Sequence, residues 1–327
     1  MNQQNTGEQI LHLFHGHAGE YLSGELISRE LGVSRTAIWK RIEQLRGLGY
    51  RIEAVPSRGY RLTASPDILL PGELKAGLDT TVIGREVVYF PATDSTNNRA
   101  NELAKGGAPE GTVVVADCQI AGKGRLGRRW ESPPGVNLYL SVILRPAIPP
   151  YHAAQLTFLS AAAVARSVAD HTGLAPTVKW PNDVLLGGRK VAGLLNELDA
   201  ETERINYLVL GIGVNLNMRA EQFPADLRYP ATALAIEIGK PVERLAFTRR
   251  LLENLDRLYG VYRAEGFAPV MEAWKQYFDL VGRSVEVDCQ EYRLRGEVVG
   301  LDEDGALLLR SPEGTEQRVL SGDVRPL

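Results

Sequence analysis

The chain has only two cysteines among its 327 residues, Cys118 and Cys289, and they lie far apart without CxxC spacing. A disulfide framework or a cysteine-based zinc site needs more thiols, usually closely spaced. The scarcity of cysteine argues against both classes of protein. It predicts instead a protein of the reducing cytoplasm.

Long apolar runs, internal repeats and low-complexity tracts are also missing. No run approaches the roughly 18 apolar residues that a membrane span needs. The N-terminal sequence MNQQNTGEQI lacks the basic and apolar regions of a signal peptide. We therefore expect no membrane partner. The chain is 44% hydrophobic and 24% charged, which is typical of a globular protein long enough for two or three domains.

The small net charge of −3 hides a basic segment. Residues 29–61 contain eight Lys or Arg side chains against three Glu, whereas residues 66–327 are net negative. Such asymmetry between segments favours a nucleic-acid-binding module near the N-terminus.

Three short helices are predicted within the same region. Ser23 and Ser34 are each placed to cap a following helix, and Gly32 ends the helix between them. In the helix after Ser34, Ile38 and Ile42 begin the i, i+4, i+7 spacing of one buried face. Two short helices joined by this tight turn form a helix-turn-helix, whose second helix reads DNA.

A β-hairpin wing is predicted to follow. Strand-like residues 50–55 and 60–62 flank the turn 56–59, which carries an arginine at its tip. We therefore expect a winged helix-turn-helix domain over residues 1–65. Its expected DNA contacts are Ser34, Arg35, Thr36 and Lys40 of the reading helix and Arg58 of the wing.

The remaining chain predicts an α+β fold. Strand candidates are 87–90, 113–116, 138–144, 178–186, 191–198 and 205–214, and helix candidates are 153–169 and 245–262. Because several strands follow one another through short loops, we expect a mixed or antiparallel sheet with helices on one face. This domain should span residues 66–281. Short strands and turns then predict a small β-barrel over residues 282–327.

The stretch from Gly122 to Trp130 combines three glycines with four cationic side chains. It contains a GxGxxG pattern, but a dinucleotide-binding fingerprint must open a helix, and here Ser132-Pro133-Pro134-Gly135 and a strand follow. The glycines let backbone N–H groups approach an anion that the cations neutralise. We predict a mobile loop over a nucleoside triphosphate or acyl-phosphate. A solvated basic surface loop is the alternative.

The segment Lys179-Trp180-Pro181-Asn182-Asp183 ends a strand beside polar groups, and Pro181 breaks the ladder. Asp183 is a candidate to hold a metal ion or a ribose hydroxyl, with a turn-capping aspartate as the alternative. The turn at 187–188 brings Lys190 back toward Asp183. There it would stabilise charge at a reacting carboxyl group, unless it is an ordinary surface lysine.

Two further segments carry polar or small residues at unusual places. Gly211 and Gly213 lie inside a strand pattern, where a ligand packs closely or the strand bulges. Asp94-Ser95-Thr96-Asn97 offers three side chains that can hydrogen-bond a small polar ring, or simply caps a helix.

Together these segments resemble the biotin–protein ligase family. The glycine–arginine loop, the Lys-Trp-Pro-Asn-Asp strand end, the following lysine and the Gly-x-Gly-x-Asn strand occur in the family's order and approximate spacing. The resemblance covers nearly the whole chain. Its winged module is similar to that of the bifunctional members, which join ligase and biotin operon repressor in one chain. A class II synthetase-like central domain and an SH3-like C-terminal barrel are implied.

The resemblance implies a role for each motif. Biotin would contact Ser95, Thr96, Asn97, Gln119, Gly122, Lys123, Gly124, Arg125, Trp130, Lys190, Gly211 and Gly213. The nucleotide would contact Arg128, Lys179, Trp180, Asn182 and Asn215. Catalysis would rest on Lys190, Arg125 and Asp183, with Asp183 also a candidate ligand of Mg²⁺. Lys123 replaces a frequent arginine, and Leu126 a frequent polar or basic residue, so the loop contacts depart from the family pattern.

The implied reaction joins biotin and ATP into biotinyl-5′-AMP and then transfers biotin to a lysine of a carboxylase carrier domain. Neither step needs an enzyme nucleophile, which agrees with the lack of a Ser-His-Asp or reactive-cysteine constellation. The expected partners are that carrier domain, operator DNA and a second copy of the chain in a ligand-promoted homodimer. A transcription factor that only senses a metabolite and a lipoate ligase remain as alternatives.

Overall fold

The computed structural model describes residues 3–327. The chain divides into two compact units, one ending at Leu78 and one running from Asp79 to Leu327. The finer division into domains after residues 65 and 281 stays a prediction. No helix within the described residues is long and apolar enough to cross a membrane.

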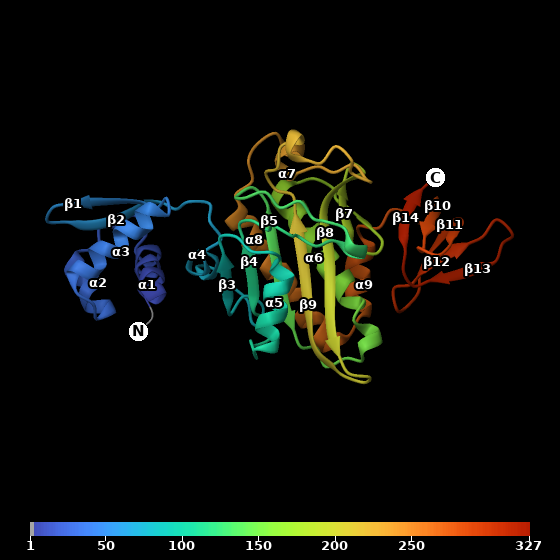
Figure 1. Ribbon diagram of the computed structural model, residues 1–327, viewed down its shortest axis with the longest axis horizontal. Helices are drawn as coiled ribbons and strands as arrows, with labels where there is room; N and C mark the ends of the chain where they lie inside the picture. Colours follow the sequence, from blue (N-terminus) through green and yellow to red (C-terminus); the bar gives the residue numbers. More distant parts are fainter. Residues whose placement is uncertain (1–2) are drawn as a thin grey trace. The chain divides into compact units, whose positions relative to one another are not determined.

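The first unit is the expected winged helix-turn-helix (Figure 1). Its elements are α1 (Gln3–Gly16), α2 (Gly24–Leu31), α3 (Arg35–Gly47), β1 (Arg51–Val55), β2 (Gly59–Ala64) and the short α4 (Pro71–Lys75). Ser23 accepts the Leu26 amide at 3.0 Å to cap α2, and Ser34 accepts the Ala37 amide at 3.2 Å to cap α3. Gly32 ends α2 at a left-handed φ of 64°. Both predicted caps are therefore confirmed.

The second unit is built on a seven-stranded mixed sheet (Figure 1). Its strands, in spatial order, are β3 (Val87–Phe90), β4 (Val113–Ala116), β5 (Leu138–Leu144), β9 (Ile205–Val214), β8 (Arg189–Ala200), β7 (Asp183–Leu186) and β6 (Thr177–Lys179). Only the β3–β4 pair is parallel, so the predicted mixed sheet is confirmed for these strands. The single strand expected over 178–186 is two strands that pair antiparallel, because the chain turns back at residues 180–182, where Pro181 has no N–H for a ladder.

Helices cover both faces of this sheet, which corrects the expectation of helices on one face. The helices α6 (Gln155–Thr172), α8 (Arg244–Glu265) and α9 (Ala268–Lys275) pack together on one face, as expected, but α5 (Thr96–Lys105) lies on the other. Successive residues of β8 show this. Asn196 Nδ2 donates to Thr157 of α6 at 2.9 Å, whereas Glu197 accepts from Asn101 of α5 at 2.6 Å. Since every residue of β5 is buried, other elements must cover both faces of the sheet at this strand.

The C-terminal segment is a five-stranded antiparallel sheet. Its strands are β10 (Ser284–Asp288), β11 (Arg293–Leu301), β12 (Leu307–Arg310), β13 (Glu316–Val319) and β14 (Asp323–Pro326). Their spatial order is β13-β12-β11-β10-β14. The short strands were predicted correctly, but in this described segment no ladder joins β13 to β14 and closes the expected barrel. The two edge strands have four residues each and pair on one side only.

Candidate active site

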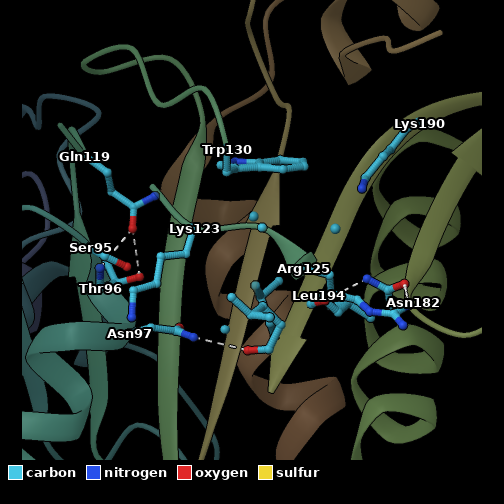
Figure 2. Close-up of a pocket in the computed structure, with 16 residues that line it drawn as sticks. Ser95, Thr96, Asn97, Gln119, Lys123, Arg125, Trp130, Asn182, Lys190 and Leu194 are labelled. Carbon is cyan, nitrogen blue, oxygen red and sulfur yellow. Dashed lines mark hydrogen bonds between the residues drawn. The ribbon is translucent and has the colours of Figure 1, made fainter. Parts of the chain in front are cut away.

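A small cavity lies on the α5 face of the sheet, and Figure 2 shows its two ends. Polar side chains from the start of α5 lie at one end, Arg125, Asn182 and Lys190 lie at the other, and the Trp130 ring extends across the space between them. Its free volume is about 50 Å³, well below the roughly 300 Å³ of a typical ligand pocket. A ligand of ordinary size therefore needs lining side chains to move.

The first end is a buried hydrogen-bond network around the start of α5. Thr96 donates its amide to Gln119 Oε1 at 2.8 Å, and Asn97 Nδ2 donates to the Leu195 carbonyl at 3.2 Å. Ser141 Oγ donates to Asn97 Oδ1 at 2.7 Å. Ser95 is the N-cap residue of α5, yet its side chain makes no capping hydrogen bond. The plain-cap alternative therefore does not account for Ser95, whose hydroxyl lines the cavity.

Glycines form the floor of the cavity. A Cβ atom on Gly211 would lie 2.2 Å from Asn97 Oδ1, and one on Gly213 would lie 2.5 Å from the Trp130 indole. A Cβ atom on Gly193, in the neighbouring strand β8, would likewise lie 2.9 Å from the Trp130 ring. Gly211 and Gly213 pair regularly with β5 and β8, so close packing, and not a bulge, explains them.

The glycine–arginine loop lies over this floor. Trp130 N donates to the Gly122 carbonyl at 2.9 Å, which closes the base of the loop. At its centre Arg125 Nη1 donates to Asn182 Oδ1 at 2.7 Å. Burial lowers the pKa of the Arg125 guanidinium, although the carboxylate of Asp183 opposes the shift. The loop contains a single 3₁₀ turn and opens no longer helix, so the rejection of a dinucleotide fingerprint is confirmed.

Lys123 borders the cavity, as expected, and forms an ion pair there. Its Nζ lies 3.0 Å from Glu197 Oε1, and its side chain is 39% exposed. Gly122 does not line the cavity, because it lies at the base of the loop against Trp130 and Ser132. A Cβ atom on Gly122 would lie 2.4 Å from the Trp130 carbonyl, so the loop closes tightly at this residue.

Lys190 and Asp183 lie side by side, as predicted, with 2.7 Å between Lys190 Nζ and Asp183 Oδ1. Lys190 Nζ also lies 5.3 Å from the centre of the Trp130 ring. These residues border a second cavity of about 560 Å³ that adjoins the first. Both cavities share Gly124, Arg125, Trp130, Asn182 and Lys190. The second cavity also reaches the expected nucleotide-binding residues Arg128 and Asn215.

Two expected nucleotide-binding residues lie behind the cavities. Trp180 is 2% exposed, and its Nε1 donates to the Gly305 carbonyl at 3.0 Å. Lys179 Nζ lies 2.9 Å from Asp323 Oδ1 and 3.6 Å from the centre of the Tyr229 ring. Both side chains thus connect the cavity wall to neighbouring segments of the chain, and neither lines a cavity.

Several lining residues were not predicted from the sequence. Asp323 and Tyr229 border the second cavity from segments far from the named motifs. Burial acts to raise the pKa of Asp323, but the hydrogen bond and charge of Lys179, with Tyr229 and Arg228, lower it below its ordinary value. Gly193 could have been predicted as a lining residue, because it is a glycine inside a predicted strand. No pattern near Asp323 in the sequence indicates that it lines a cavity.

The expected DNA-binding residues lie in the first unit. Thr36 and Lys40 are exposed on α3, whereas the Ser34 hydroxyl is engaged in capping. Arg35 Nη2 lies 3.0 Å from Glu25 Oε2. Arg58 is exposed on the wing turn. Within residues 3–327, no three His, Cys, Asp or Glu side chains gather as a metal site.

Three known families match separate parts of the chain. Residues 89–215 match the biotin/lipoate A/B protein ligase family, residues 7–61 an HTH domain, and residues 282–325 the biotin protein ligase C-terminal domain.

Known proteins are similar over the whole chain. The bifunctional ligase/repressor BirA of Bacillus subtilis is 39% identical over 317 residues, which cover 97% of both chains. The Escherichia coli protein of the same name is 33% identical over 310 residues, covering 94% of this chain and 93% of its own. The Aquifex aeolicus biotin protein ligase in complex with biotin and ATP is 29% identical, with a TM-score of 0.64 over 74% of this chain and 99% of its own.

Proposed function

The chain belongs to the family of bifunctional biotin–protein ligases and repressors, and from this premise we propose how its two activities work. As a ligase, it activates biotin with ATP to biotinyl-5′-AMP and transfers biotin to a lysine of a carboxylase carrier domain. As a repressor, it binds the operators of biotin synthesis and transport genes, with biotinyl-5′-AMP as corepressor. A cytoplasmic location and domain boundaries after residues 65 and 281 belong to the same proposal.

One observation supports the ligase assignment most strongly. A small polar cavity and a larger cavity meet at Lys190 and Arg125. Biotin has a polar ureido ring at one end and a carboxylate at the other. The small polar cavity suits the ring, and the positive charge at the junction of the cavities suits the carboxylate. The ring lies among Ser95, Thr96, Asn97 and Gln119, and the carboxylate reaches the junction, where the nucleotide in the larger cavity meets it.

The first step forms a bond between the biotin carboxylate and the α-phosphorus of ATP, and pyrophosphate leaves. Lys190 and Arg125 supply positive charge at the oxygens where negative charge develops. Asn182 holds Arg125 through their 2.7 Å hydrogen bond. In the second step a carrier lysine amine attacks the mixed anhydride and AMP leaves. The residues act through positioning and charge, because no enzyme nucleophile takes part.

Mg²⁺ is part of the proposal. In nucleotide enzymes Mg²⁺ is commonly held by one or two carboxylates together with substrate phosphates, so a cluster of acidic residues is not needed. Asp183 borders the larger cavity and is the residue that would hold the ion. When bound, Mg²⁺ would neutralise charge on the triphosphate.

The direct test is mass spectrometry of a purified biotin carrier domain after incubation with the chain, biotin, ATP and Mg²⁺. We expect a mass increase of one biotin on one lysine, and none when ATP is omitted. A parallel incubation with lipoate addresses the other substrate of the matched family. Modification by lipoate and not by biotin would contradict the proposal.

The loop gives a further prediction. Arg125→Gly should let biotinyl-5′-AMP escape, because the loop loses its hydrogen bond to Asn182 and closes less often. Free adenylate should then acylate lysines of a bystander protein, which mass spectrometry detects. Arg204→Gly is a matched control, since Arg204 is an exposed arginine of the β8–β9 turn. Unchanged acceptor specificity of Arg125→Gly would count against a shielding loop.

Repression predicts a link between the two activities. Biotinyl-5′-AMP should order the loop at 122–130, and an ordered loop loses less entropy when a second copy packs on it. We therefore propose a ligand-promoted homodimer, with a coupling of about 1–3 kcal/mol between adenylate and dimerisation. Sedimentation without ligand, with biotin, and with biotin plus ATP measures this coupling. Identical dimerisation in all three conditions would contradict it.

A further inference from the structure

The wing is joined to the segment before α2 by two backbone hydrogen bonds. Leu22 N donates to the Tyr60 carbonyl at 2.8 Å, and Tyr60 N donates to the Leu22 carbonyl at 2.9 Å. Gly59 allows this approach, since its φ is 103° and a Cβ there would lie 2.1 Å from Leu22 O. The wing turn is therefore held close to residue 21.

At that place the ring of Tyr21 contacts two arginines of the wing. The Cζ atoms of Arg58 and Arg61 lie 4.3 Å and 4.5 Å from the ring centre. The Tyr21 hydroxyl donates to Glu53 Oε2 at 3.0 Å. Both guanidinium groups are within the range of cation–π attraction.

The two arginines differ in charge balance. Arg61 Nη2 lies 2.7 Å from Glu53 Oε2, so a carboxylate neutralises much of its charge. Among the described residues Arg58 has no ion pair, and it is exposed on the wing turn. An aromatic ring orients a guanidinium without adding an opposite formal charge, whereas a carboxylate both orients and neutralises it. Arg58 is thus held in place with its positive charge available.

We propose that Tyr21 is a positioning residue for DNA binding, which holds Arg58 on the wing ready to contact a phosphate group. This inference rests on the proposed DNA-binding role of the first unit. A free arginine side chain loses rotamer entropy when it contacts a phosphate, and the Tyr21 ring reduces that loss. Phosphate contacts contribute affinity regardless of base sequence, so the effect should not depend on the operator.

The test uses the full chain with biotin and ATP and a DNA duplex that the wild type recovers from a randomised pool. Affinity is measured by fluorescence anisotropy over a series of salt concentrations. Arg58→Ala should weaken binding and reduce the salt slope by about one phosphate contact. Tyr21→Leu should weaken binding by about two- to fivefold. Tyr21→Phe, which keeps the ring, should bind like the wild type.

Double variants separate positioning from general damage. In the Arg58→Ala background, Tyr21→Leu should add little, because the side chain that it positions is gone. Thermal unfolding and biotinylation of the carrier domain confirm that each variant folds. Equal losses from Tyr21→Leu with and without Arg58 would overturn the inference, as would wild-type binding by Tyr21→Leu. A wild-type chain that binds no duplex would instead overturn the proposed DNA-binding function.

Discussion

Replacing Lys190 by Ala should slow formation of biotinyl-5′-AMP by about 10²–10³-fold, the usual cost of removing one preorganised charge donor from an active site. Lys190 Nζ lies at the junction of the two cavities, 2.7 Å from Asp183. Removing it takes away positive charge beside the biotin carboxylate that attacks the α-phosphorus, and leaves Asp183 without its partner. Pyrophosphate release in single-turnover experiments measures this step directly.

Two further variants show whether the lost positive charge causes the slower formation of biotinyl-5′-AMP. Lys190→Met keeps an unbranched side chain next to Trp130 and should lose as much activity as Lys190→Ala, because only the charge is needed. Lys275→Ala removes a lysine that lies 2.9 Å from Glu272 on the exposed side of α9, and it should retain full activity. Pyrophosphate release at the wild-type rate by Lys190→Ala would exclude Lys190 from the mechanism.

The second large effect is expected from Gly211→Ala. The added Cβ would lie 2.2 Å from Asn97 Oδ1, which is held by Ser141, so Asn97 must move. Forcing one extra carbon into a close-packed site typically costs about 1–3 kcal/mol. This cost lowers the free energy of unfolding. If the displaced Asn97 is a biotin contact, the biotin group that it leaves unpaired should also cost about 1–3 kcal/mol, which is a loss of biotin affinity of about 5–150-fold. Isothermal titration with biotin measures it.

Gly260→Ala is the matched control. Gly260 lies within α8, and a Cβ there would meet no atom within 4 Å. Alanine also favours a helix, so stability should be equal or slightly higher and biotin affinity unchanged. Wild-type biotin affinity of Gly211→Ala would place the biotin ring elsewhere than beside Asn97.

Local patterns in the sequence were sufficient for much of the fold. Capping serines, a glycine at the end of α2 and helical periodicity predicted α2 and α3 of the winged module, because these signals act over a few residues. The bounds of β3, β4, β5 and β9 match their predicted ranges, since each is a mainly apolar segment between turn residues. The order of the glycine–arginine loop, the Lys-Trp-Pro-Asn-Asp segment and the following lysine was enough to indicate the family.

Only the tertiary structure decided which of these residues meet. Ser95 and Gly211 border the same cavity because β9 lies beside β5 and α5 crosses that face, and a buried strand does not reveal which helix covers which side. Trp180 and Lys179 do not line the cavities, because each is bonded to a residue from a distant segment, Gly305 and Asp323 respectively. The sequence alone thus determined the chemical groups available for binding and catalysis. Their distances depend on long-range packing, which short-range periodicity does not encode.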